Sequence, residues 1–155
     1  MDNLTFILTY NKIQAINWDF KYMRSFLQIS SKSQYALRML ACIASSKNAY
    51  VSLSEVAKKE GISHGYLEEI VAPLKKNGIL ESKGGRSGGY KLARGSEKTN
   101  IADILRIFEG KITPVKCLGI AKCSKQPICK TQVVWKKLKD SVDNALEEMR
   151  LSDIL

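Results

Sequence analysis

Two short helical segments on either side of a glycine constrain the fold more than any other part of the sequence. Ser52 and Glu55 form a capping-box pattern, which predicts the start of a helix, and Gly61 is placed to end it. Ser63 is placed to cap a second helix, which ends at Gly78. Two short helices joined by a tight turn that contains glycine are typical of a helix-turn-helix unit.

The segments that flank these two helices predict a winged helix-turn-helix domain. Residues 30–46 carry apolar side chains at helical spacing, and residues 101–108 predict a further short helix. Residues 79–82 and 90–93 are short strand candidates around a glycine-rich turn, so we expect a β-hairpin wing with a basic tip. Pro73 lies inside the second helix of the motif, where we expect a bend rather than a break. The expected fold class is mainly α with a small β-hairpin wing and a long C-terminal dimerisation helix.

That C-terminal helix is predicted from an apolar seam. Between residues 131 and 149, apolar residues recur at alternating steps of three and four, which is the spacing of a coiled coil. Such a seam packs either on its own domain or on a second copy of the helix, and we favour a homodimer. The residues of the predicted seam are Trp135, Leu138, Val142, Ala145 and Met149.

The predicted elements divide the chain into four parts. Residues 27–110 form the winged helix-turn-helix domain, residues 111–130 form a cysteine-rich loop, and residues 131–155 form the dimerisation helix and a tail. Residues 1–26 show no clear periodicity, and we interpret them as an N-terminal extension that is either poorly ordered or non-native. Met23 is a reasonable alternative start.

The charge balance makes a polyanion the expected partner. The 155 residues include 25 Lys and Arg against 15 Asp and Glu, a formal net charge of +10. This basic balance favours nucleic acid over membrane as the partner. No apolar run approaches the roughly 18 residues of a spanning helix, so we expect no transmembrane segment. The N-terminus lacks the basic region and cleavage site of a signal peptide, so we expect a cytoplasmic protein with reduced thiols. We expect no enzyme, since we find no C-x-x-C pair, nucleotide-binding fingerprint or paired catalytic carboxylates.

Three of the four cysteines lie in one short window with equal spacing, C-x5-C-x5-C. Cys117, Cys123 and Cys129 can converge on one metal centre, whereas Cys42 lies in an apolar helical run and is expected in the core. Structural zinc sites pair ligands about two to four residues apart and use four of them, which this window does not provide. A disulfide is disfavoured because the window holds an odd number of cysteines and because thiols stay reduced in the cytoplasm. We favour an iron–sulfur cluster, and zinc and redox-active thiols are the alternatives.

Residues on the second helix of the motif and on the wing are expected to contact double-stranded DNA. The turn that follows Ser63 should face base edges in the major groove, and Arg86 at the wing tip suits a narrow minor groove. Basic residues nearby should contact phosphates and give affinity rather than sequence choice. The expected contacts are Ser63, His64, Gly65, Tyr66, Glu68, Glu69, Lys75, Lys76, Lys83, Arg86, Lys91, Lys32 and Arg38.

Three stretches of the sequence resemble the Rrf2 family of transcription regulators. They are SSKSQYALRML, SLSEVAKKEGISHGYLEEIVAPLKKNGILES and RSGGYKLAR, and the resemblance extends over residues 27–155. The three cysteines and the closing WKKL and LSDIL are similar to the cluster-binding, IscR- and NsrR-like branch. The resemblance implies a DNA-binding homodimer that senses iron–sulfur status, redox state or nitric oxide. The alternative is a cluster-free repressor of the CymR type, which acts through a partner protein or thiol redox.

The resemblance also implies roles for single positions. Glu68 matches a position that contacts bases in IscR-like members, whereas their wing arginine falls at Gly84 of this chain. Their histidine ligand falls at Gln132, and an acidic ligand of nitric-oxide-sensing members falls at Gln34. Amides are poor iron ligands, and the single histidine, His64, belongs to the DNA-reading helix, so the fourth ligand stays open. A [2Fe–2S] cluster is favoured, and [4Fe–4S] is the alternative.

Overall fold

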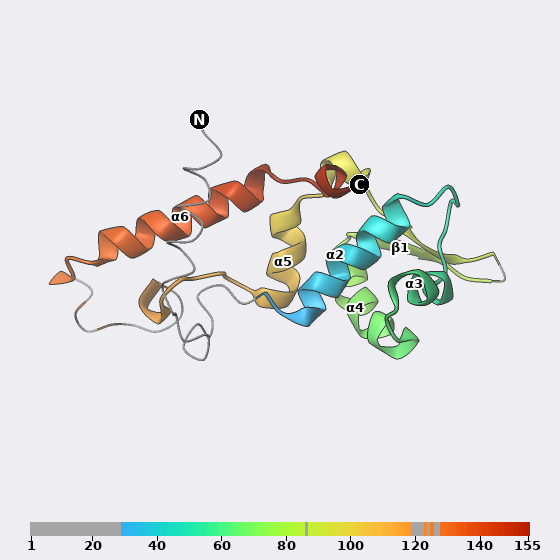
Figure 1. The fold of residues 1–155 in the computed structure, drawn as a ribbon, viewed down its shortest axis with the longest axis horizontal. Coiled ribbons are helices and arrows are strands. Elements are labelled where there is room, and N and C mark those ends of the chain that lie inside the picture. Colours follow the sequence, from blue (N-terminus) through green and yellow to red (C-terminus); the bar gives the residue numbers. More distant parts are fainter. Residues whose placement is uncertain (1–28, 86, 119–122, 124, 126–127) are drawn as a thin grey trace, which may run out of the picture.

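The computed structural model describes residues 29–85, 87–118, 123, 125 and 128–155. It confirms the predicted fold class, because this part of the chain is mainly helical with one two-stranded antiparallel sheet. The predicted helices and strands are all present, with boundaries displaced by at most two residues. In chain order (Figure 1) the elements are α2 (Ser31–Ala44), α3 (Leu53–Glu60), α4 (His64–Lys76), β1 (Leu80–Lys83), β2 (Gly89–Leu92), η1 (Ser96–Lys98), α5 (Ile101–Glu109), η2 (Lys116–Leu118), α6 (Gln132–Glu148) and η4 (Leu151–Ile154).

α3 begins and ends at its predicted capping residues, Ser52 and Gly61, and α4 begins at its predicted cap, Ser63. The side chains of Ser30, Ser52 and Ser63 each accept a hydrogen bond from the backbone N–H three residues further on. Such a bond satisfies one of the amides that a helix start leaves unpaired. Gly61 ends α3 with a φ of 67°, a left-handed conformation that favours glycine. The helix α4 continues through Pro73 to Lys76.

The wing is joined to the helices by a close backbone contact. β1 and β2 pair with Leu80 opposite Leu92. On the other edge of β2, Val51 N–H donates to the Tyr90 carbonyl at 2.9 Å, and Tyr90 N–H donates to the Val51 carbonyl at 2.8 Å. A Cβ atom on Gly89 would collide with the Val51 carbonyl, and Gly89 has a φ of 150°. This close approach explains why glycine precedes Tyr90.

One hydrophobic core joins α2, α3, α4, α5 and the base of the wing. Cys42 belongs to this core with 6% of its surface exposed, as predicted. The close packing of the side chains fixes how α4 and the wing are presented. The largest apolar side chains that are completely buried are Met39, Leu40, Val56, Leu67, Ile70, Leu74, Ile104 and Leu151.

The C-terminal residues return to this core, which the sequence did not predict. Leu151 in η4 has no exposed surface. Its backbone N–H donates to the Thr99 carbonyl at 2.8 Å, and Ile101 N–H donates to the Met149 carbonyl at 3.1 Å. The end of α6 is therefore tied to the start of α5.

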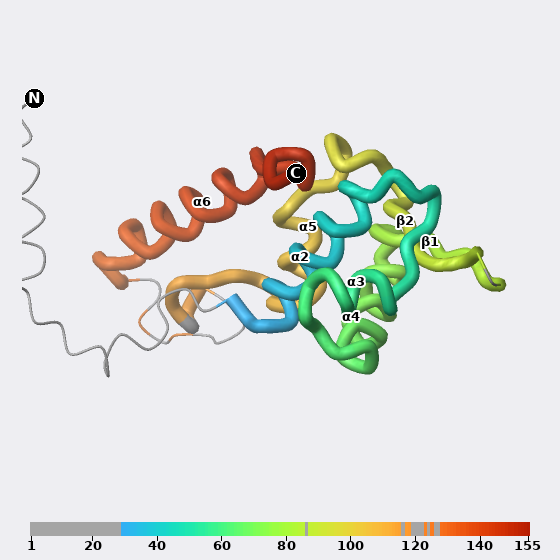
Figure 2. The backbone as a smooth tube through the Cα atoms, turned by 45° about the vertical axis from the view of Figure 1, so that its right-hand side comes forward, coloured from blue at the N-terminus to red at the C-terminus, as the bar shows by residue number. Residues whose placement is uncertain are grey.

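The long helix α6 extends away from the winged-helix domain, here the described residues from α2 to α5 (Figure 2). None of its residues is buried. The helix is joined to the domain at its C-terminal end, and its first turn lies farthest away. No helix in the described ranges is both long and apolar enough to cross a membrane.

Candidate nucleic-acid interface and cysteine loop

The first turns of α4 present predicted base-reading residues on the surface. Ser63 accepts a hydrogen bond from the Tyr66 N–H at 3.4 Å, which fixes the start of the helix. His64 and Glu68 are exposed, with His64 Nδ1 3.7 Å from Glu68 Oε1. Gly65 lies between them and has no atom near enough to obstruct a side chain. These positions form a surface that a base pair can approach.

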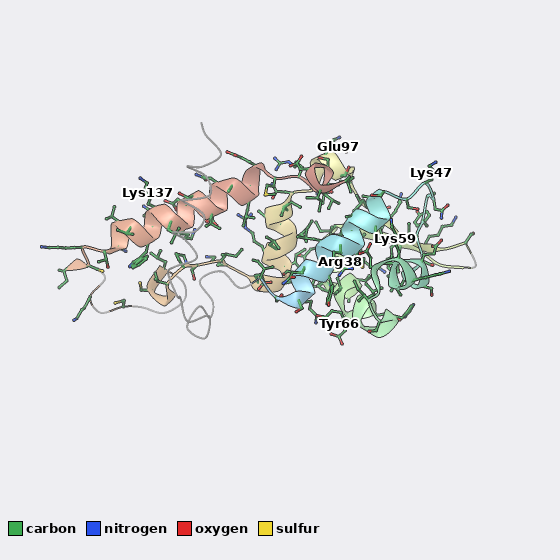
Figure 3. The ribbon with its side chains drawn as sticks, in the orientation of Figure 1. Arg38, Lys47, Lys59, Tyr66, Glu97 and Lys137 are labelled. Atoms are coloured by element: carbon green, nitrogen blue, oxygen red, sulfur yellow. The ribbon has the colours of Figure 1, made fainter. Side chains whose placement is uncertain are left out.

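Two other predicted contacts on α4, Tyr66 and Glu69, instead join this helix to α2. Lys32 Nζ donates to Glu69 Oε2 at 2.9 Å and lies 5.9 Å from the centre of the Tyr66 ring. The Tyr66 ring, labelled below α4 in Figure 3, meets the Tyr35 ring edge-on with centres 5.7 Å apart. The charge of Glu69 is therefore compensated within the protein.

Arg38, a predicted phosphate contact, joins α2 to α3 (Figure 3). Its Nε donates to the Glu60 carboxylate at 3.0 Å, and an Nη donates to the Glu60 carbonyl at 2.7 Å. Its guanidinium lies 5.6 Å from the centre of the Tyr35 ring. A cation is favourable at the C-terminal end of a helix, and Glu60 ends α3. The structure thus gives Arg38 a role in packing the helices.

The lysines of the wing lie around one aromatic ring. The ammonium groups of Lys83 and Lys91 lie 5.7 Å and 5.4 Å from the centre of the Tyr50 ring. Lys91 Nζ is also 3.1 Å from the Glu81 carboxylate across the hairpin. The hydrogen bond and charge of Glu81 raise the pKa of Lys91. The predicted wing-tip contact, Arg86, lies outside the described residues.

Three predicted phosphate contacts, Lys75, Lys76 and Lys83, form no ion pair within the described part of the chain. Lys75 lies over the Tyr90 ring at 6.0 Å from its centre. Lys75 and Lys76 occupy the last turn of α4, and Lys83 ends β1. Their charges are therefore not compensated by a described carboxylate, which suits contact with phosphates.

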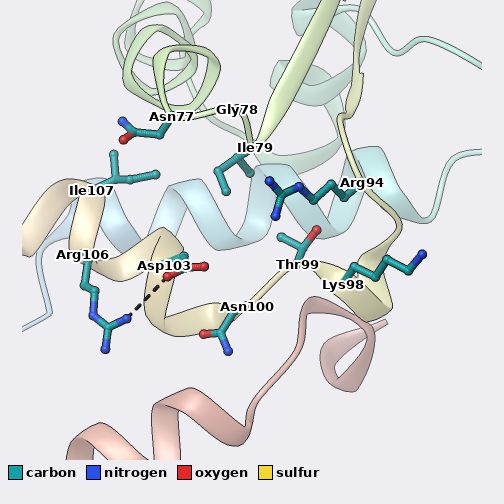
Figure 4. A pocket seen from close by; sticks show the side chains of 10 residues that line it. All are labelled: Asn77, Gly78, Ile79, Arg94, Lys98, Thr99, Asn100, Asp103, Arg106 and Ile107. Atoms are coloured by element: carbon teal, nitrogen blue, oxygen red, sulfur yellow. Dashed lines mark hydrogen bonds and ion pairs between the residues drawn. The ribbon is translucent and has the colours of Figure 1, made fainter.

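A polar joint holds α6 against the start of α5. Asn100 Nδ2 donates to the Glu147 carbonyl at 2.7 Å, and Arg106 pairs with the carboxylates of Glu147 and Asp103. The hydrogen bond from Arg106 to Glu147 raises the pKa of Arg106. Figure 4 shows Asn100 and Arg106 on the side of α5 that faces α6, below a polar cavity of about 350 Å³ that Arg94 also lines. This joint places α6 relative to α5.

The predicted seam of α6 is exposed or half-buried along its whole length. The adjoining Val133 and Val134 are 69% and 55% exposed. Because successive residues of a helix turn by about 100°, the seam lies beside the strip that faces α5 and is not part of it. That strip lines a cavity of about 240 Å³ and consists of Lys139, Asp143 and Leu146.

The three predicted metal ligands lie between α5 and α6. Cys117 belongs to η2, Cys129 precedes α6, and all three cysteines are half-buried and free of disulfides. Among the described residues, no three Cys, His, Asp or Glu side chains are close enough to share a metal ion. The three described thiols therefore do not form such a group.

The chemistry of the thiols distinguishes the loop from the core. The Thr131 hydroxyl, 3.3 Å from the Cys129 sulfur, and the backbone N–H groups of Thr131 and Gln132 lower the pKa of Cys129. Burial raises the pKa of Cys42. Since the thiolate is the form that binds metals, Cys129 is better suited to bind a metal than Cys42.

Glu109, at the end of α5, is a functional candidate that sequence reasoning missed. Its Oε1 accepts hydrogen bonds from the Ser30 N–H at 2.8 Å, from the Ser30 hydroxyl at 2.6 Å, and from the hydroxyl of buried Ser33. Partial burial raises the pKa of Glu109, but the three hydrogen bonds outweigh it, so its pKa is lowered. A serine-rich helix start predicts a cap, but gives no sign of an acceptor 79 residues away.

Comparison with known proteins places this arrangement in a family. The Rrf2 family, described as an iron-dependent transcriptional regulator, matches residues 29–155. The chain belongs to the Rrf2 family. An HTH-type transcriptional regulator of Haemophilus influenzae is 31% identical over 130 residues, covering 83% of this chain and 87% of that protein. IscR of Photorhabdus laumondii is 27% identical, covering 83% and 79% respectively.

Solved structures of Rrf2 regulators share the fold. CymR, the global cysteine regulator of B. subtilis, has a TM-score of 0.69 and 29% identity, covering 83% of this chain and 95% of that one. IscR of T. potens has a TM-score of 0.66 and 31% identity, covering 83% and 85%. The family resemblance seen in the sequence is confirmed. The chain is an Rrf2 transcription regulator of the IscR and CymR type, in a family of DNA-binding proteins, and it is not an enzyme.

Proposed function

We propose that this Rrf2 protein is a cytoplasmic, homodimeric regulator that binds a two-fold-related operator and senses iron–sulfur status, redox state or nitric oxide. Cys117, Cys123 and Cys129 would hold an iron–sulfur cluster, with [2Fe–2S] favoured. The observation that carries this proposal is the loop itself. Three evenly spaced thiols lie between the winged-helix domain and α6, and one of them has a lowered pKa.

Coordination by the loop cysteines would connect the sensing event to the geometry of the dimer. A bound cluster supplies a redox-active iron centre whose properties depend on its ligands and its solvent exposure. Cys117 follows α5 and Cys129 directly precedes α6, so ligation by both would fix the path between the two helices. The spacing of two recognition helices in a dimer would then differ between the ligated and the free loop.

The DNA contacts of the proposed regulator fall into three groups. Base reading is assigned to the exposed start of α4, and phosphate contact to the lysines that lack a described carboxylate partner. Arg86 and Lys91 are assigned to the wing. Lys32, Tyr66 and Glu69 are assigned to holding α4 in place, and Arg38 to joining α2 to α3. The first two groups are Ser63, His64, Gly65 and Glu68 for bases, and Lys75, Lys76 and Lys83 for phosphates.

The charge pattern of α6 supports pairing with a second copy in an antiparallel direction. The seam from Trp135 to Met149 has no cover in the described part of the chain. Antiparallel pairing places the basic half of one helix beside the acidic half of the other, whereas parallel pairing places like charges together. Lys136 and Lys137 in the first half and Glu148 in the second form no ion pair in the described part of the chain, whereas Lys139, Asp143 and Glu147 already form ion pairs within the chain.

A second candidate function is a cluster-free repressor of the CymR type, acting through a partner protein or thiol redox. One observation favours it. The fold is as similar to CymR as to IscR, with TM-scores of 0.69 and 0.66. A cluster-free repressor would not explain the even spacing of Cys117, Cys123 and Cys129.

Iron and zinc content, measured beside DNA binding, tests the proposal. Protein purified without oxygen should be coloured and contain iron, and Cys123→Ala should lose the iron. Cys42→Ala is the matched control and should keep it, because Cys42 is buried in the core. Operator affinity should change in the same titration that removes the cluster. Stoichiometric zinc without iron, or identical operator binding by wild type and Cys123→Ala, would contradict cluster sensing and favour the second candidate.

A further inference from the structure

We propose that Glu109 is a positioning residue that couples the cysteine loop to the recognition helix α4 through the first turns of α2. The inference rests on the proposed cluster-dependent DNA binding. It gives a role to Glu109, which the sequence motifs did not single out. The evidence is a pair of contacts, one on each side of residues 30–35.

The first contact joins α2 to the point where the loop begins. Glu109 is the last residue of α5, and Gly110, with a φ of 68°, turns the chain into the loop. The Glu109 carboxylate accepts three hydrogen bonds from Ser30 and Ser33, and Ser33 has no exposed surface. Hydrogen bonds to a charged acceptor are about twice as strong as neutral ones, and a carboxylate at a helix N-terminus is favourable. Glu109 thus caps α2 from outside the helix.

The second contact joins the same turns of α2 to the recognition helix. Lys32 donates to Glu69 at 2.9 Å, and the rings of Tyr35 and Tyr66 meet edge-on at 5.7 Å. Glu69 and Tyr66 lie in the first two turns of α4, next to the exposed base-reading positions. In Figure 1 the start of α2 lies between the end of α5 and α4.

The order of these contacts explains how a change in the loop would reach DNA. Movement of the chain at Gly110 acts first on Glu109, and loss of its hydrogen bonds leaves the start of α2 without its charged cap. The side chains of Lys32 and Tyr35 are then no longer held in place, so they no longer fix the positions of Glu69 and Tyr66. The base-reading surface of α4 would respond to the loop without direct contact between them.

Glu109→Gln tests the coupling, because the amide keeps the shape of the carboxylate but loses its charge. Operator affinity is measured with and without the cluster, and the wild-type ratio is expected to be about 5- to 150-fold, the usual range of such coupling. The variant should retain wild-type iron content and dimer size, and its ratio should fall towards one. Glu97→Gln is the matched control and should keep the wild-type ratio, since Glu97 is exposed on η1, away from the loop.

A measurement on the unmodified protein keeps the test independent of how the variant folds. Hydrogen exchange of wild type should show that backbone amides of residues 31–36 and 64–70 gain or lose protection together when the cluster is removed. The coupling role would be overturned, and cluster sensing left intact, by unchanged hydrogen exchange in residues 31–36. The same holds if Glu109→Gln keeps the wild-type ratio of operator affinities with and without the cluster. If wild-type protein binds no iron, or if its operator affinity is the same with and without the cluster, the proposed function is refuted and this inference with it.

Discussion

Truncation of Leu151 tests whether the C-terminal turn anchors the long helix α6. The side chain is completely buried in the core of the winged-helix domain. Backbone hydrogen bonds from Ile101 to Met149 and from Leu151 to Thr99 hold the chain on either side of it. Leu151→Ala should therefore destabilise the domain and loosen the end of α6.

The magnitude follows from the burial of the side chain. Leu→Ala removes three carbon atoms, and transfer of each into water costs about 0.8 kcal/mol, or ~2.4 kcal/mol together. The cavity that remains adds to this, and fully buried Leu→Ala changes cost about 2–5 kcal/mol in total. We expect a loss of about 3 kcal/mol, because η4 is a short terminal turn that can partly collapse into the space. At about 3 °C per kcal/mol, Tm should fall by roughly 10 °C.

Denaturant and thermal unfolding at a fixed protein concentration measure this loss. Leu155→Ala is the matched control, because Leu155 is 54% exposed, and its free energy of unfolding should change by less than about 0.5 kcal/mol. Operator affinity of Leu151→Ala should also fall, because α6 is less firmly tied to the recognition helices. A loss below about 1 kcal/mol would show that Leu151 is not an anchor.

Three further predictions address DNA binding, assembly and pH. Arg86→Ala should weaken operator binding by about 1–3 kcal/mol, whereas Lys76→Ala should weaken specific and non-specific binding alike and reduce the salt slope by about one, both measured by fluorescence anisotropy. Val142→Glu should give a monomer in light scattering, while Asn144→Glu on the opposite side of α6 should not. Because the folded pKa of Glu109 is lowered from 4.5, its stabilisation is present above pH 4.5 and is lost as pH falls through the lower folded value. The difference in unfolding free energy between wild type and Glu109→Gln should therefore be constant near neutral pH and shrink in acid.

The elements of the fold were predictable because their signals are local. Ser52 and Gly61 define α3 through hydrogen bonds within a few residues, and the alternation of strands and turns defines the hairpin. The glycine before Tyr90 was predictable as a turn residue. Its close contact with Val51 was not, because that contact depends on how two distant segments pack.

Long-range contacts account for what the sequence left out. Nothing near Leu151 distinguishes it from an exposed tail residue, and its burial depends on the bonds between the end of α6 and the start of α5. The ion pairs of Lys32 and Arg38 are also long-range contacts that the sequence did not predict. A basic residue on a basic protein predicts a phosphate contact, yet both side chains have carboxylate partners on other helices.

The cysteine loop shows how far spacing alone can support a site. Equal gaps between Cys117, Cys123 and Cys129 identify a candidate ligand set, but the separation of thiols in space depends on the conformation of the loop. In the described conformation they are not gathered. The lowered pKa of Cys129 depends on Thr131, which no metal-site motif includes. Candidate ligands can thus be named from the sequence, whereas the pKa of each thiol depends on the hydrogen bonds around it.

The two adjacent carboxylates of α4 show why structure is needed to assign base readers. Glu68 and Glu69 are equivalent in sequence, but neighbouring residues on a helix point about 100° apart. Glu69 therefore reaches Lys32 of α2, whereas Glu68 has only the His64 imidazole, 3.7 Å away, as a described partner. A carboxylate near DNA is unfavourable unless it accepts a hydrogen bond, which the amino group of cytosine can donate. The compensation of Glu69 within the protein leaves Glu68 as the carboxylate whose position suits reading a cytosine.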